Sequence, residues 1–342
     1  MRSCRQVRYL KHFHELDETD HNPGLFDTIM HLCRPSAINN AISTNVRYNA
    51  SYALAQILIP IDPSLIFNTN PSWTAASAIG PLNSLIKPQD ASAESEEQGP
   101  APSTHATFTA MRALTNLASL CAESATQITT VCFPSLESHL WSSVSAIQQA
   151  ATECILNLSS ASPLAASKFF FAGPRVAEAE AEASKAATQG SFGKEEKAAA
   201  KTRLTLLFAL TGSKSRGTRL AAMGAIAGLL AWEDGAVSFL NLPLSAAGIE
   251  TDRPGGMKKQ GTTPAARLVA SIQEAVADGD GDMLARAVTA VCALVEAGGK
   301  DGRGKVREAG GVDLLKALSA ADAVKALGLG DVVAEALGLL KT

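Results

Sequence analysis

Residues 105–119 read HATFTAMRALTNLAS, and this stretch decides the fold of the 342-residue chain. Its apolar side chains recur at positions i, i+3, i+4 and i+7, which places them on one face of an α-helix. We call these four positions the seam. In this copy they are Ala110, Ala113, Leu114 and Leu117. Two of the four are alanine, and small side chains let neighbouring helices approach closely, so the stretch predicts one unit of a helical stack.

The same seam recurs along the chain, about 41 to 71 residues apart. Once the insertions between copies are subtracted, this spacing approaches the period of about 40 to 47 residues that HEAT and armadillo repeats have. The seam therefore predicts a repeat architecture. The other copies are Ala50, Ala53, Leu54 and Ile57; Ala151, Cys154, Ile155 and Leu158; Ala222, Ala225, Ile226 and Leu229; Ala287, Ala290, Val291 and Leu294; and a weaker one, Val333, Ala336, Leu337 and Leu340.

A second pattern favours the armadillo type of repeat. The segments EAGGVDLLKAL (308–318) and IGPLNSLI (79–86) look like its second helix, for which the pattern small-Gly-x-x-x-Leu-x-x-Leu is typical. We therefore predict an all-α fold, an armadillo/HEAT-like right-handed α-solenoid of about five to six repeats. The repeats fill the length as one domain over residues 1–342.

Three stretches interrupt the repeats and are predicted to be flexible insertions. Residues 87–103 are polar, acidic and proline-bearing, which predicts a disordered loop. Residues 174–200 are rich in Ala, Glu and Lys, and we favour a partly helical insertion over plain disorder. Residues 245–263 end in DRPGGMKKQGT and are predicted to form another flexible loop.

Composition excludes several classes of protein. A net charge of −3 gives no electrostatic reason to bind nucleic acid or an anionic membrane. The longest apolar run, residues 220–232, is too short to span a bilayer, and residues 1–18 lack the apolar core of a signal peptide. The six cysteines are scattered and form no CxxC pair, which is typical of a reduced, cytoplasmic protein.

Two clusters of acidic or histidine residues could be metal sites, but neither has the required pattern. His12 and His14, followed by Glu15, are two positions apart and would point to different faces of a helix. Asp278, Asp280 and Asp282 resemble the first ligands of a calcium loop, but Met283 replaces the required glycine and Thr289 the closing glutamate. With no HExxH, GxSxG or Walker A motif either, we predict no metal, no cofactor and no enzymatic activity.

What remains is a binding surface on the third helix of each repeat, which lines the concave face of an armadillo stack. A polar side chain there can hydrogen-bond an extended peptide, because an amide offers both a donor and an acceptor. The alternative is that such amides bond only neighbouring backbone or cap helix ends. The equivalent seam positions are Gln56, Asn116, Asn157, Gly228, Ala293 and Leu339, and we predict a client-binding groove at the first three.

The chain resembles the UCS-domain family of myosin-specific chaperones. The resemblance runs from about residue 45 to residue 240. It lies in YALAQILIPIDPSLIF (52–67), ALTNLAS (113–119), AATECILNLS (150–159), FFFAG (169–173) and RLTLLFAL (203–210), followed by AAMGAIAGLL.

This resemblance implies a chaperone whose armadillo canyon holds the motor domain of myosin heavy chain during folding and assembly. It also implies Hsp90 as a further partner and Asn116 as a canyon residue. The chain is similar to the fungal type, without the tetratricopeptide module of animal members. Where the family usually has basic residues before AATEC, this chain has Gln148 and Gln149.

The alternative function is a general armadillo adaptor that binds an extended peptide of another partner. An importin-like protein that binds basic signal peptides would need tryptophans interleaved with asparagines at regular repeat positions. The tryptophans of this chain do not recur at one repeat position, which counts against an importin-like function; they are Trp73, Trp141 and Trp232.

Overall fold

The computed structural model describes residues 25–34, 42–69, 73–88, 102–168, 203–242 and 263–341. Within these ranges the regular secondary structure is entirely α-helical, as the sequence predicted, and there is no strand. The chain divides into two compact units, Met1–Ala161 and Ser162–Thr342.

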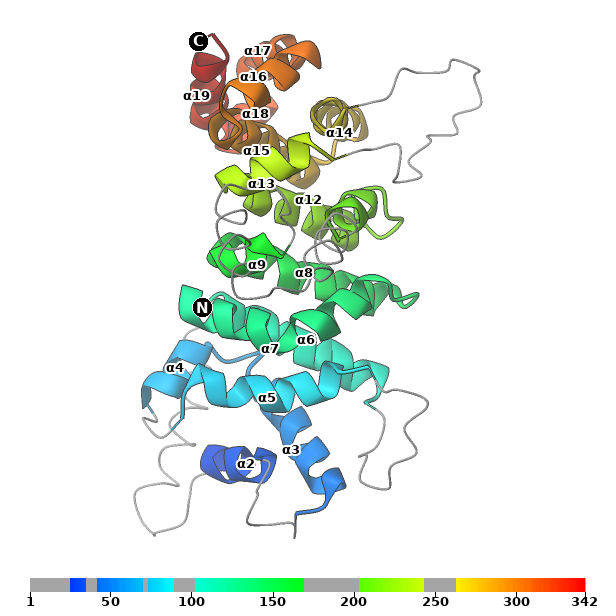
Figure 1. Ribbon diagram of the computed structural model, residues 1–342, viewed down its shortest axis with the longest axis vertical. Helices are drawn as coiled ribbons and strands as arrows, with labels where there is room; N and C mark the ends of the chain where they lie inside the picture. Colours follow the sequence, from blue (N-terminus) through cyan, green and yellow to red (C-terminus); the bar gives the residue numbers. More distant parts are fainter. Residues whose placement is uncertain are drawn as a thin grey trace, which may run out of the picture. The chain divides into compact units, whose positions relative to one another are not determined.

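The first unit consists of two layers of helices (Figure 1). Helices α3, α6 and α8 pack successively on one another and form one layer, and α5 packs on α7 in the other. The layers meet through α5 on α6 and α7 on α8. The helices are α2 (Leu25–Cys33), α3 (Thr44–Ile57), α4 (Pro63–Thr69), α5 (Ala75–Ile86), α6 (Thr104–Ala118), α7 (Ala122–Leu140) and α8 (Ser145–Ala161).

The second unit repeats this arrangement. Helix α12 packs on α15 and α15 on α19, while α14 lies against α15 and α16. The helices are α9 (Pro163–Ser167), residues 203–210, α12 (Arg216–Leu230), α13 (Glu233–Leu240), α14 (Pro264–Asp278), α15 (Gly281–Ala297), α16 (Gly299–Glu308), α17 (Gly311–Ala320), α18 (Asp322–Ala326) and α19 (Gly330–Lys341).

The seam residues lie on the packed side of the third helices, which are α3, α6 and α8 in the first unit and α12, α15 and α19 in the second. In α6 all four seam side chains are fully buried. The other copies are buried as well, apart from Ala53, Ile57 and Leu337, which are half-buried. Removing this apolar surface from water is the main force that joins one repeat to the next.

Polar caps fix where the third helices begin. Ser103 accepts a hydrogen bond from the backbone N–H of Ala106, and Ser215 accepts one from Thr218. A side-chain oxygen at this position satisfies one of the N–H groups that a helix start leaves without a partner. Ser43 and Asp280 do the same for α3 and α15.

The predicted second-helix pattern EAGGVDLLKAL covers the start of α17. Gly310 has φ = 78°, a left-handed conformation that glycine adopts without strain. At Gly311 a Cβ atom would lie 2.5 Å from Cγ1 of Val306, so only glycine permits this approach of α17 to α16. The two glycines therefore have different physical roles in one turn.

The predicted insertions fall largely outside the described residues. Residues 89–101, 174–200 and 245–262 lie outside them, as does the cluster at His12 and His14. That residues 1–342 form a single domain stays a prediction.

Candidate functional site

The three predicted groove residues occupy equivalent places near the ends of α3, α6 and α8. Gln56 is exposed, and Asn116 and Asn157 are half-buried. Because these helices pack side by side, the structure brings the three positions onto one face of the first unit. We call this surface the third-helix face.

The amide of Asn116 joins α6 to the end of α3. Its Nδ2 donates to the carbonyl oxygen of Leu58 at 3.0 Å and to that of Ile59 at 3.2 Å. Both carbonyls lie just beyond the last residue of α3, where a helix leaves its C=O groups without intrahelical partners. Asn116 therefore caps the preceding third helix from the next repeat.

Asn157 repeats the arrangement one repeat further on. Its Nδ2 donates to the carbonyl oxygen of Thr115, in the last turn of α6, at 3.1 Å. These are hydrogen bonds that the alternative interpretation expected, so both N–H groups of Asn116 and one N–H group of Asn157 serve the chain itself. The predicted contact with a client stays a prediction, and it falls to the Oδ1 oxygens, to the second N–H of Asn157 and to exposed Gln56.

A second row of polar side chains lies one turn before the amides, and the sequence analysis missed it. It consists of Tyr52, Arg112 and Glu153, each four residues before its amide and hence on the same helix face. The guanidinium of Arg112 lies 5.8 Å from the centre of the Phe108 ring. The spacing of four residues was the signal that could have revealed this row.

Aromatic and polar groups connect α3 to α6 across the same face. The hydroxyl of Tyr52 and Nδ1 of His105 are 2.7 Å apart, and their rings meet edge to face at 5.9 Å. The hydroxyl of Tyr48 accepts a hydrogen bond from the backbone N–H of Ser103. Tyrosine and arginine are enriched in protein interfaces, so this composition suits recognition of a partner.

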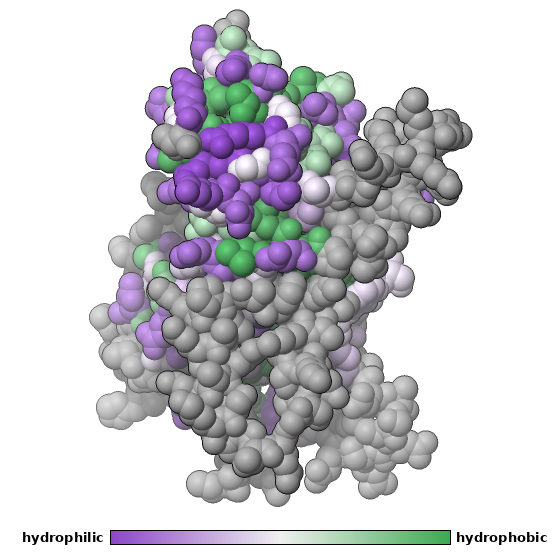
Figure 2. Space-filling model, turned by 45° about the horizontal axis from the view of Figure 1, so that its top comes forward, coloured by the Kyte–Doolittle hydropathy of each residue, from purple (hydrophilic) through white to green (hydrophobic). Residues whose placement is uncertain are grey.

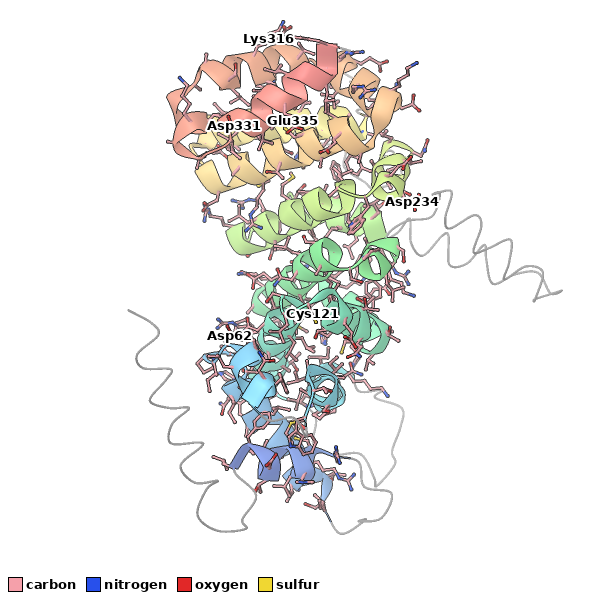
Figure 3. The ribbon with its side chains drawn as sticks, turned by 90° about the vertical axis from the view of Figure 1, so that its left-hand side faces the viewer. Asp62, Cys121, Asp234, Lys316, Asp331 and Glu335 are labelled. Atoms are coloured by element: carbon pink, nitrogen blue, oxygen red, sulfur yellow. The ribbon has the colours of Figure 1, made fainter. Side chains whose placement is uncertain are left out.

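The equivalent surface of the second unit has a different character. Its amide positions hold Gly228, Ala293 and Leu339. Figure 3 shows Asp331 and Glu335 on α19, one turn apart and both exposed. Figure 2 shows hydrophilic residues over much of the visible surface of this unit, with hydrophobic patches between them. At these equivalent positions of the described third helices, amides therefore occur only in the first unit.

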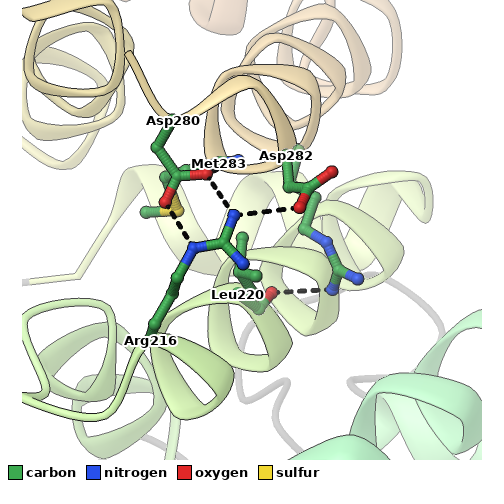
Figure 4. A network of polar contacts seen from close by, with 6 residues as sticks. Arg216, Leu220, Asp280, Asp282 and Met283 are labelled. Carbon is green, nitrogen blue, oxygen red and sulfur yellow. Dashed lines mark hydrogen bonds and ion pairs between the residues drawn. The ribbon is translucent and has the colours of Figure 1, made fainter. Parts of the chain in front are cut away.

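The acidic DGDGD segment belongs to a helix contact (Figure 4). Arg216 donates to both carboxylate oxygens of Asp280, at 3.0 and 2.7 Å, and to Asp282 at 2.9 Å. Asp280 also caps α15 by accepting from the N–H of Met283. The hydrogen bond from Arg216 is the main reason that the pKa of Asp280 lies below its usual value. These carboxylates thus hold α12 and α15 together.

The described cysteines differ in exposure. Cys121 is exposed at the start of α7, and hydrogen bonds from Ser124 lower its pKa. Burial raises the pKa of Cys33 to about 11 and that of Cys154 to about 12. Cys132 and Cys292 are likewise buried with raised pKa values. This pattern leaves Cys121 as the accessible thiol among the described residues.

The described residues contain no group of three or more His, Cys, Asp or Glu side chains that could hold a metal ion. No single helix among the described residues is long and apolar enough to cross a membrane. Helices α12 and α13, which are bent by 113° relative to each other, reach that length and composition only when they are taken together.

Comparison with known sequences gives one partial relative. The chain is 31% identical over 194 residues to "Ring assembly protein 3" of Schizosaccharomyces pombe (strain 972 / ATCC 24843). The match covers 57% of this chain and 22% of the relative, so the chain spans about a fifth of that protein's length. No family model matches the sequence.

Comparison with solved structures establishes the fold. A designed armadillo repeat protein matches with a TM-score of 0.56 at 17% identity, covering 92% of this chain and 98% of its own. A second one, in complex with the peptide (KR)4, gives the same score and identity over 91% and 98%. She4p matches with a TM-score of 0.57 at 19% identity over 92% of this chain and 37% of its own. The fold defines an armadillo-repeat protein, as the sequence predicted.

Proposed function

We propose that this chain is a non-enzymatic assembly chaperone of the UCS class that binds the motor domain of myosin heavy chain. The client would lie on the third-helix face of the first unit. The proposal rests on the position of the segments that resemble the UCS-domain family. ALTNLAS (113–119) closes α6 and AATECILNLS (150–159) lies in α8, so both segments build this face.

The comparisons support the proposal in two ways. The partial relative is named for ring assembly, which accords with a role in assembly. The armadillo fold, shared with She4p among others, supplies stacked third helices on which a client can lie. A cytoplasmic location and the participation of Hsp90 stay predictions.

The adaptor function is the second candidate, and one observation favours it. The designed armadillo repeat protein bound to (KR)4 is a protein of this fold that holds a basic peptide. An adaptor would bind such a segment without recognising a folded motor. The two functions therefore differ in the kind of partner.

The test is a binding measurement with two probes, a purified myosin motor domain and a fluorescent (KR)4 peptide. We expect saturable binding of the motor domain and suppression of its aggregation on mild heating. Binding of (KR)4 alone would favour the adaptor function, and absence of motor-domain binding would contradict the chaperone function.

A further inference from the structure

The third-helix face of the first unit carries two opposite charges at equivalent positions. Arg112 is the only Lys, Arg, Asp or Glu residue of α6, and Glu153 is the only one of α8. Each lies four residues before its amide, Asn116 or Asn157. Because α6 packs on α8, the two charged residues occupy equivalent positions of neighbouring helices.

Neither charge is used in an ion pair within the described residues. Neither Arg112 nor Glu153 has an ion-pair partner among the described residues, and they do not pair with each other. Arg112 is exposed, with the ring of Phe108 beside it. Glu153 is half-buried, and its Oε1 accepts a hydrogen bond from Nε2 of Gln149 at 2.8 Å. Each group is oriented on its own helix and remains available to a partner.

Packed helices lie about 8 to 10 Å apart. An extended chain advances about 3.3 Å per residue, so about three residues span two neighbouring third helices. We propose that this face recognises an extended client segment that places a carboxylate on Arg112 and a basic side chain on Glu153, about three residues apart. The inference rests on the proposed function and adds the chemistry by which the client is chosen.

The residue types suit these roles. A guanidinium can donate two parallel hydrogen bonds to one carboxylate, and stacking on an aromatic ring restricts its orientation. Arg112 has such a ring in Phe108. Glu153 keeps acceptor capacity beyond the hydrogen bond from Gln149, since an ionised carboxylate has about four acceptor sites. A segment with two like charges would be repelled at one of the positions.

The test measures the affinity of the full chain for a purified myosin motor domain. We expect Arg112→Glu and Glu153→Arg each to weaken binding at least about tenfold, because each places like charges in contact. The double variant, which restores the net charge, should bind no better than either single variant. Lys87→Glu at the end of α5 and Glu123→Arg in α7 are controls with the same changes in charge at exposed positions, and should leave affinity within about twofold.

The outcomes separate the two proposals. If Arg112→Glu and Glu153→Arg both bind the motor domain as tightly as the wild type, this inference is overturned and the proposed function stands. Recovery of affinity in the double variant would also overturn it, because net charge alone would then explain the losses. Absence of wild-type binding would contradict the proposed function and this inference with it. Melting curves identify any loss that comes from unfolding.

Discussion

The Nδ2 group of Asn116 donates a hydrogen bond of 3.0 Å to the carbonyl oxygen of Leu58, 58 residues earlier in the chain. This contact ties the end of one third helix to the next repeat, and Asn157 makes the same kind of contact with Thr115. Asn116, which we predicted to contact a client, therefore also joins one repeat to the next.

The stability of the first unit should depend on the amide of Asn116. Asn116→Ala removes hydrogen bonds to two carbonyls, and a typical bond contributes about 0.5 to 1.5 kcal/mol. Asn116→Asp should cost more, because a carboxylate oxygen would then face the carbonyl oxygens of Leu58 and Ile59. Urea denaturation measures both losses. Equal stability of the Asp variant and the wild type would show that the amide does not donate to these carbonyls.

Gln56 offers a test of client binding that is separate from stability. Its side chain is exposed at the equivalent position of α3. We expect Gln56→Ala to weaken motor-domain binding several-fold while the melting temperature stays within about one degree, since exposed substitutions change stability little. Gly228→Ala, at a position without an amide, serves as the control and should not weaken binding comparably. Unchanged binding by Gln56→Ala would remove this residue from the site.

The seam should dominate the stability of the stack. Leu114 is fully buried between α6 and its neighbours, so Leu114→Ala should cost about 2 to 5 kcal/mol through lost burial and the cavity left behind. Val131→Ala in α7 is the control, because Val131 is 44% exposed. Thermal denaturation followed by circular dichroism measures both. A similar loss from the two substitutions would contradict the assignment of the seam.

Alkylation should distinguish the cysteines. The thiolate is the reactive form, and the pKa of exposed Cys121 is lowered whereas burial raises the pKa of Cys33 and Cys154. In a Cys4→Ser variant, which removes the cysteine outside the described residues, iodoacetamide at neutral pH should label Cys121 first. Mass spectrometry of peptides identifies the site. Earlier labelling of Cys33 or Cys154 would show that their helices open readily.

The contact between Arg216 and Asp280 should make stability depend on pH. The pKa of Asp280 is lowered in the folded state, so its stabilising contribution is present above the unfolded value of about 3.9 and is lost as pH falls through the folded value. Asp280→Asn keeps a capping oxygen but loses the charge. The variant should be less stable than the wild type at pH 7, and the difference should shrink as pH falls below about 4 and vanish once pH is below the folded pKa of Asp280. A difference in melting temperature between Asp280→Asn and the wild type that does not shrink at all as pH is lowered from 7 to 2 would contradict this assignment.

The sequence predicted the fold because the determinants of the fold are local. The period of the seam and the glycines at the start of α17 follow from helix geometry and from backbone conformation, which act within a few residues. The candidate site was predicted less completely. The positions of Gln56, Asn116 and Asn157 on one face followed from the repeat, but the bonds of the two asparagines did not.

The sequence by itself therefore determined the repeat and the faces of its helices, since a spacing of 3.6 residues assigns each side chain to a side. Only the tertiary structure decided which groups those side chains meet. Asn116 reaches the carbonyl of Leu58, and Arg216 reaches Asp280, 64 residues away. Such contacts depend on how one repeat packs on another, and no pattern within a single helix encodes the distance between two atoms on different helices.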